Sequence, residues 1–178
     1  MALRGPGDDP GPDVTVQLTS RGTHPPPSTE GELMPDRTAQ AVAEQSVREF
    51  LAADTAARAL GITVSQVAPG AVTAHMTIAR EMLNGHGSAH GAALFAVADI
   101  AFAMACNSHG APAVGRSCTI EYLAPAFADE AVTATAVERA VVGRGGIYDV
   151  AVTRDADGRL LAELRGHSRL VPSAPGTA

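Results

Sequence analysis

A short stretch of the chain carries groups whose types and spacing suit acyl chemistry. It contains Asn84, His90 and Gly91, and an acidic side chain follows at Asp99. An amide, an imidazole and a backbone N–H can hold a carbonyl oxygen as it becomes negative, and a carboxylate can activate water or attack directly. We expect these groups to gather around the start of one helix, where water would be activated beside a polarised carbonyl.

Asp99 needs an explanation because it interrupts the apolar run of residues 94–103. A carboxylate is costly to bury without a compensating partner. Its side chain either reaches the surface or caps a neighbouring loop, or it faces a cleft as a general base or nucleophile. In the cleft, desolvation and nearby donors would set the pKa of its carboxyl.

The groups before Asp99 each have a functional and a structural interpretation. Gly91 stands where the helix should begin, so its N–H lacks an intrahelical partner and can hold an oxyanion, or the glycine permits a tight turn. His90 can donate to the same carbonyl or cap the helix. Asn84 can bind the carbonyl or form a turn with Gly85. The spacing of the set is more informative than any one member.

The surrounding pattern predicts an α+β domain in which an antiparallel sheet wraps one central helix. Residues 89–108 lack proline and are apolar almost all round, which is typical of an enclosed helix. Four strand-like runs without intervening helices follow, and they predict an antiparallel sheet. These runs cover residues 114–123, 131–142, 146–153 and 160–170. An amphipathic helix over 38–59, a hairpin of 62–64 with 72–78, and a loop over 80–87 precede the central helix.

Composition limits the domain organisation and the classes of partner. The chain has 178 residues, and its first 36 hold seven of the twelve prolines. We expect a disordered extension over 1–36, one domain over 37–172 and a flexible tail over 173–178. The net charge of −6 disfavours nucleic acid, and no apolar run is long enough to cross a bilayer, so we expect a cytoplasmic protein. Cys106 and Cys118 are expected to be buried thiols without chemistry.

The order of these residues resembles the hotdog-fold acyl-CoA thioesterases of the phenylacetate-degradation (PaaI) type. The similarity extends from about Glu44 to about Leu170, and it is most specific from Asn84 through Asp99 to the segment 117–125. The resemblance implies a long helix wrapped by an antiparallel sheet, a dimer formed by joined sheets, and a tetramer of two dimers. It places the active site at the dimer interface.

The resemblance also implies a role for each site residue. Asp99 would activate water or attack the thioester, and the N–H of Gly91 would polarise the thioester oxygen with help from His90 and Asn84. Ser117 would help to place the water from the neighbouring subunit. Two departures stand out: Ala92 replaces a second glycine of many relatives, which leaves a backbone N–H available, and the proline-rich extension lies outside the match.

The expected reaction is hydrolysis of an acyl-CoA, with a phenylacetyl or hydroxyphenylacetyl type of acyl group, to the free acid and CoA. It needs no cofactor, since CoA is part of the substrate. Arg144, in a glycine-rich turn, and Arg116, beside Ser117, are candidates for the CoA phosphates, and Arg165 is another.

Other functions remain open at the level of sequence. A hotdog enzyme that hydrates enoyl or dehydrates 3-hydroxyacyl thioesters would use the same histidine and carboxylate. A non-catalytic acyl-CoA-binding module would use the same cleft. His86 and His90, with His75 or Asp99, suggest a metal site only weakly, because no zinc-type motif accompanies them, and we expect no metal.

Overall fold

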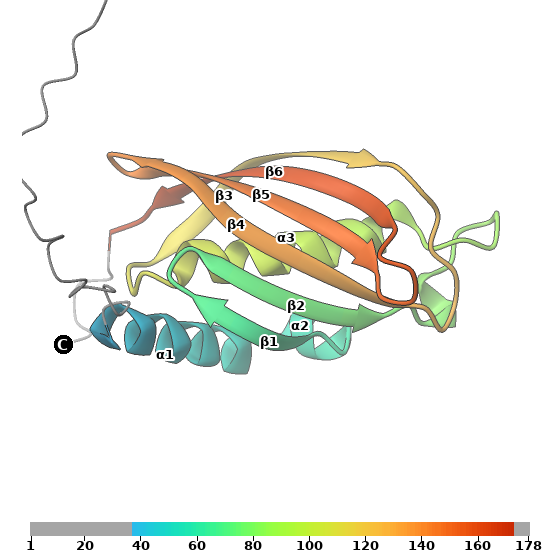
Figure 1. Cartoon of the computed structure of the whole chain (residues 1–178), viewed down its shortest axis with the longest axis horizontal. Coiled ribbons are helices and arrows are strands. Elements are labelled where there is room, and N and C mark those ends of the chain that lie inside the picture. Colours follow the sequence, from blue (N-terminus) through green and yellow to red (C-terminus); the bar gives the residue numbers. More distant parts are fainter. Residues whose placement is uncertain (1–36, 173–178) are drawn as a thin grey trace, which may run out of the picture. The chain divides into compact units, whose positions relative to one another are not determined.

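The computed structural model describes residues 37–172, so the expected extension at 1–36 and tail at 173–178 lie outside the described residues. Two helices and a hairpin precede the central helix, and four successive strands follow it, in the order that the sequence predicts (Figure 1). The elements are α1 (Arg37–Ala53), α2 (Thr55–Ala59), β1 (Thr63–Ala68), β2 (Ala71–Thr77), the 3-10 turn η1 (Arg80–Met82), α3 (Gly91–Asn107), β3 (Ala113–Tyr122), β4 (Ala131–Val142), β5 (Gly145–Arg154) and β6 (Leu160–Leu170).

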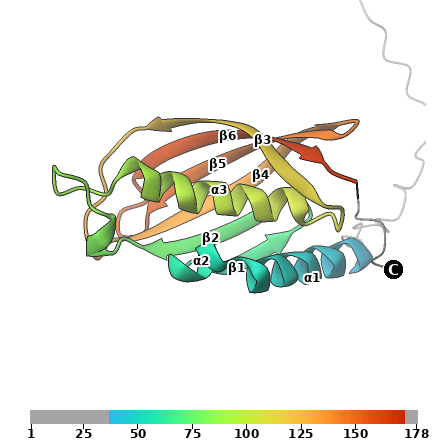
Figure 2. The ribbon, with the colours of Figure 1, turned by 180° about the vertical axis from the view of Figure 1, so that it is seen from behind.

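Within residues 37–172 the strands form one six-stranded sheet with the order β1-β2-β4-β5-β6-β3. Every neighbouring pair is antiparallel. The sheet curves around α3, while α1 lies beside β1 (Figures 1 and 2). This arrangement confirms the predicted α+β class and the hotdog architecture, and it leaves β1 and β3 at the two edges of the sheet.

The core forms where α3 meets the concave face of the sheet. Small residues on α3, among them Ala98, Ala101 and Ala105, are fully buried and let the helix approach the strands closely. The ring of Phe102 is 1% exposed and packs 5.5 Å from the ring of Tyr148. A Cβ at Gly166 would lie 2.9 Å from the Phe102 ring, so glycine is needed there to admit the ring.

Replacing Phe102 with alanine is expected to lower the free energy of unfolding by about 3–5 kcal/mol, because the variant leaves a cavity under a curved sheet that cannot collapse. Urea unfolding measures the change. Val142→Ala, at a side chain that is 80% exposed, is the control and should stay within about 0.5 kcal/mol of the parent. A loss of under about 1 kcal/mol in Phe102→Ala would contradict this account of the core.

Three sequence-based expectations need correction. The helix predicted over 38–59 is two helices, because Asp54 adopts extended backbone and its side chain accepts a hydrogen bond from the N–H of Ala57, which starts α2. The loop expected over 80–87 contains η1. The central helix is not enclosed on every side: a stripe of partly or fully exposed residues runs along α3. The stripe comprises Ala92, Phe95, Ala96, Asp99 and Ala103.

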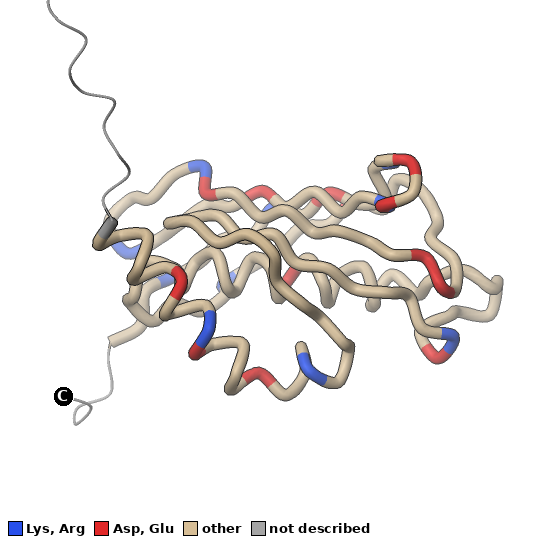
Figure 3. Tube along the Cα trace, turned by 60° about the horizontal axis from the view of Figure 1, so that its bottom comes forward, with Lys and Arg blue, Asp and Glu red and all other residues tan. Residues whose placement is uncertain are grey.

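Charged residues are spread over α1, the strands and the loops (Figure 3). Along α3, in contrast, Asp99 is the one charged residue. Among the described residues, no helix is both long and apolar enough to span a membrane.

Candidate active site

A cavity of about 400 Å³ opens beside Asp99, between the exposed stripe of α3 and the edge strand β3. The α3 residues that line it recur at helical spacing, so they share one face of the helix. The lining residues are Phe95, Asp99, Phe102 and Ala103 from α3 and Gly115, Arg116, Ser117 and Cys118 from β3. Of the two interpretations of Asp99, the structure supports the one in which its side chain faces a cleft.

Burial raises the pKa of the Asp99 carboxyl above its ordinary value, and a hydrogen bond from Cys118 offsets part of this effect. The Cys118 Sγ lies 3.7 Å from Asp99 Oδ1. Within residues 37–172, Asp99 makes no other hydrogen bond or ion pair. A partly desolvated carboxylate without a cationic partner is a stronger base than an exposed one, which suits proton transfer from water.

A β-bulge in β3 shapes the wall of this cavity. The register of β3 against β6 passes from Gly115 opposite Ser168 to Ser117 opposite His167, so Arg116 has no opposite residue. Such an extra residue bends a strand and redirects the side chains that follow it.

The bulge changes which side chains of β3 face α3. Before it, Ala113 is buried in the core. After it, Cys118 and Ile120 pack against the core, whereas Thr119 and Glu121 face the opposite side of the sheet. Without the extra residue the odd-numbered positions would continue to face the helix. The bulge therefore delivers Cys118 to Asp99.

The start of α3 carries the second half of the predicted site. Within the described residues the N–H of Gly91 makes no hydrogen bond, as expected for the first helical residue. The Tyr122 hydroxyl donates to the Gly91 carbonyl over 3.0 Å. A Cβ at Gly91 would lie 2.9 Å from the Tyr122 ring, so the glycine permits this close contact.

His90 and Asn84 support the helix start rather than pointing at an acyl group. His90 Nδ1 accepts a hydrogen bond from the N–H of Ala92 over 3.1 Å, which makes His90 the N-cap of α3. Asn84 Oδ1 accepts from the N–H of His86 over 2.8 Å, and Asn84 Nδ2 donates to Ser88 Oγ over 3.1 Å. The capping and turn interpretations therefore describe this chain, and they leave His90 Nε2 unused within the described residues.

One expectation about the geometry is wrong for a single chain. Asp99 does not lie at the helix start with Gly91, because eight residues of α-helix place it about 12 Å further along the axis. One thioester carbonyl cannot contact both groups of the same protomer. The predicted set is therefore split into an acid half at Asp99 and an oxyanion half at Gly91.

The remaining candidate residues lie in different parts of the structure. Ser117 and Arg116 line the Asp99 cavity of their own chain, so Ser117 and Asp99 lie together within one protomer. Arg144 lies outside the cavity, where its guanidinium donates to the Leu170 carbonyl over 2.8 Å. The sequence prediction missed Cys118, which was expected to be a buried thiol but is only partly buried and contacts the acid.

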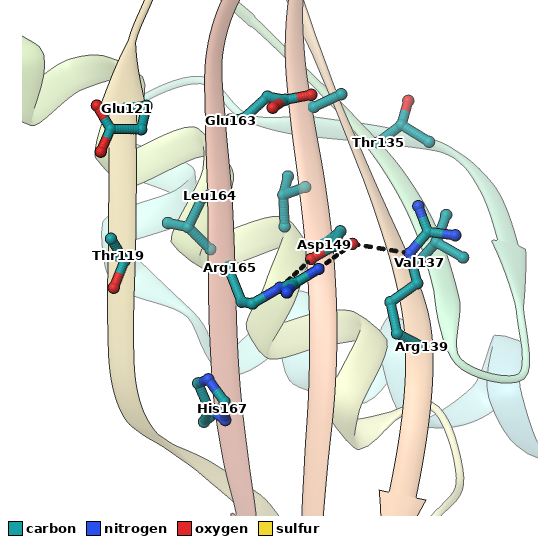
Figure 4. Close-up of a pocket in the computed structure, with 12 residues that line it drawn as sticks. Thr119, Glu121, Thr135, Val137, Arg139, Asp149, Glu163, Leu164, Arg165 and His167 are labelled. Carbon is teal, nitrogen blue, oxygen red and sulfur yellow. Dashed lines mark hydrogen bonds and ion pairs between the residues drawn. The ribbon is translucent and has the colours of Figure 1, made fainter. Parts of the chain in front are cut away.

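A second hollow of about 630 Å³ lies on the opposite face of the sheet (Figure 4). Asp149 lies at the centre of this hollow. Its carboxylate forms ion pairs with Arg165, whose Nε is 2.7 Å from Oδ1, and with Arg139, whose Nε is 2.9 Å from Oδ2. These arginines lower the pKa of the Asp149 carboxyl. Because both arginines are paired with Asp149, and Glu121 and Glu163 outweigh the one positive charge that remains, we do not assign the acyl site or the CoA phosphates to this hollow. The same pairing removes Arg165 as a free phosphate ligand.

Among the described residues, no three histidine, cysteine, aspartate or glutamate side chains come together in a way that could hold a metal ion. His86 and His90 are separated by the turn that Asn84 organises, so they share no helical face.

Comparison with known proteins agrees with the fold. Residues 86–161 match the thioesterase superfamily. The acyl-coenzyme A thioesterase PaaI of Escherichia coli is 42% identical over 118 residues, covering 66% of this chain and 84% of the relative. The human acyl-coenzyme A thioesterase 13 is 35% identical over 131 residues, covering 68% of this chain and 91% of the relative. The solved structure of E. coli PaaI superposes with a TM-score of 0.74 at 38% identity, covering 76% of this chain and 98% of the other.

These matches, with the sheet-wrapped helix and its acidic cavity, define the class of protein: a hotdog-fold thioester hydrolase. The chain belongs to the thioesterase superfamily and, within it, to the PaaI type.

Proposed function

We propose that the protein hydrolyses an acyl-CoA thioester, with an acyl group of the phenylacetyl or hydroxyphenylacetyl type, to the free acid and CoA. The observation that carries the proposal is Asp99, a partly buried carboxylate with a raised pKa, no cationic partner in the described structure and a cavity at its side. The cavity is walled by two aromatic rings, Phe95 and Phe102, which suits an aryl group.

The active site in this proposal is shared by two copies of the chain. Among the described strands β3 has a free edge, and both of its faces are largely exposed, with Val114 and Tyr122 each 50% exposed. A long unpaired edge strand is a template for pairing with a second chain. Antiparallel pairing of two copies of β3 would bring the exposed stripes of two α3 helices together.

Two-fold symmetry makes every contact between the two helices reciprocal. In an antiparallel pair of α3 helices, Asp99 of one protomer lies opposite Gly91 of its partner when the axis passes beside Phe95, the residue midway between them. The two halves that one chain keeps about 12 Å apart would form two complete sites in the dimer. The resemblance to the family extends this to a tetramer of two dimers.

In each site the residues would divide the work of hydrolysis. Water attacks the thioester carbon while Asp99 accepts its proton, or Asp99 attacks first and water hydrolyses the resulting anhydride. The N–H of Gly91 stabilises the oxyanion, with the helix dipole behind it. His90 Nε2 lies on the same helix start as a further donor, and Asn84 holds the loop before it. Ser117 orients the water, and the CoA thiolate leaves and takes up a proton.

Arg116 is the arginine best placed to meet an anionic part of the substrate. It lines the Asp99 cavity, and its guanidinium makes no hydrogen bond or ion pair with the described residues. Arg144 stays a weaker candidate because a carbonyl oxygen already occupies its guanidinium.

The test is product analysis with a panel of acyl-CoA substrates, from phenylacetyl and hydroxyphenylacetyl to short and medium aliphatic chains. We expect release of free thiol, fastest with an aryl-acetyl group. A change in enoyl absorbance without thiol would instead indicate a hydratase. Tight binding of the CoA ester with neither product would indicate a binding module.

A further inference from the structure

The acid of the site has a single hydrogen-bond donor in the described structure, the thiol of Cys118. Its Sγ lies 3.7 Å from Asp99 Oδ1, and both side chains line the same cavity. Cys118 reaches this position because of the bulge at Arg116, which turns position 118 towards α3. An extra residue in an edge strand that delivers one side chain to the acid is typical of a functional feature.

We propose that Cys118 is a positioning residue: its thiol holds Asp99 Oδ1, which leaves Oδ2 as the oxygen that receives the proton of the attacking water. This inference rests on the proposed function. The thiol itself is not the nucleophile. The Asp99 contact fixes the orientation of the carboxylate in a wide cavity, where rotation about its side chain would otherwise move the base away from the water.

The chemistry of a thiol suits this role better than that of a hydroxyl. Burial and the neighbouring carboxylate raise the pKa of the Cys118 thiol to about 11, so it keeps its hydrogen at neutral pH and acts as a donor. A thiol is a weak donor, and it orients the carboxylate without removing much of its basicity. A serine hydroxyl at the same place would bind more strongly and lower the pKa of Asp99.

The other titratable and charged groups near Asp99 are few. Cys106 is buried on the same helix, and its thiol donates to the Ala103 carbonyl rather than to the acid. Arg116 lines the cavity without an ion pair to Asp99. Cys118 is therefore the side chain whose replacement should act most directly on the carboxylate.

The experiment compares Cys118→Ala and Cys118→Ser with the parent, using thiol release from phenylacetyl-CoA across a range of pH. The acid limb of the kcat/KM profile reports the Asp99 carboxyl. In Cys118→Ala the limb should move to higher pH, because the carboxylate loses its donor, and kcat at neutral pH should fall about three- to tenfold, the contribution of one hydrogen bond. In Cys118→Ser the limb should move to lower pH.

Cys106→Ala is the matched control, since it removes a neighbouring thiol that does not contact Asp99, and its acid limb should coincide with that of the parent. If both Cys118 variants also coincide with the parent in limb and kcat, the inference is overturned. If Cys118→Ala fails to fold, the nearly isosteric Cys118→Ser tests the inference alone. A shift of its acid limb to lower pH supports the role of Cys118, and an unshifted limb overturns it. Full activity in Asp99→Asn would overturn the proposed function instead, so the two failures are distinguishable.

Discussion

Asp99→Asn is expected to lower kcat for acyl-CoA hydrolysis by about 10²–10⁴-fold, the range that a positioned general base contributes. The amide keeps the size and shape of the carboxylate but cannot accept the proton of water or form an anhydride. Initial rates of thiol release at saturating substrate measure the loss. A matched control is Glu121→Gln, which neutralises an exposed carboxylate on the opposite face of the sheet and should keep the parental rate.

The fold of Asp99→Asn should remain intact, so that the loss of rate can be assigned to chemistry. Burial raises the pKa of the Asp99 carboxyl, which means that folding disfavours its ionised form. At neutral pH the parent carries this penalty and the variant does not, so the melting temperature of Asp99→Asn should not fall below that of the parent. Parental activity in a folded Asp99→Asn would contradict the role of Asp99.

The sign of the pH dependence follows from the same shift. The base works as a carboxylate, so kcat/KM should fall as the pH drops through the pKa of Asp99. Because that pKa is raised, the acid limb should lie above the ordinary range of an aspartate.

The elements that the sequence predicted most accurately are those with clear boundaries. The strands β4 and β6 begin and end at the predicted residues, 131–142 and 160–170. Turn residues mark these limits, with Asp129 in a left-handed backbone conformation before β4 and Gly158 in another before β6. The backbone preference of a turn residue is a local property, so a single sequence is enough to predict where these strands begin and end.

The site was predicted less completely because one of its features depends on how two strands pair. The bulge at Arg116 exists only relative to β6, so the run 114–123 does not by itself reveal which side chains face α3. The role of Cys118 was missed for this reason. The division between Asp99 and Gly91, in contrast, follows from their spacing of eight residues and helical geometry alone.

The oxyanion half of the site predicts an equally specific effect at Gly91. Gly91→Pro removes the N–H and suits the first position of a helix, and the backbone of His90, with φ −61 and ψ 138, suits a residue before proline. Gly91→Ala adds a Cβ against Tyr122 but keeps the N–H, so it controls for the steric change. We expect Gly91→Pro to be about 10²–10³-fold slower in kcat than Gly91→Ala. Equal rates would contradict donation by this N–H.

Mixing the two defects tests whether the site is shared. In a heterodimer of Asp99→Asn with Gly91→Pro, one site contains both defects, and the other combines the intact Asp99 of one protomer with the intact Gly91 of its partner. Co-refolding equal amounts gives half heterodimers, each with one competent site, so thiol release should recover to about one quarter of the parental rate. If both residues served a site within one protomer, every site in the mixture would be defective and no recovery would occur. Recovery would therefore show that Asp99 of one protomer and Gly91 of another serve the same site.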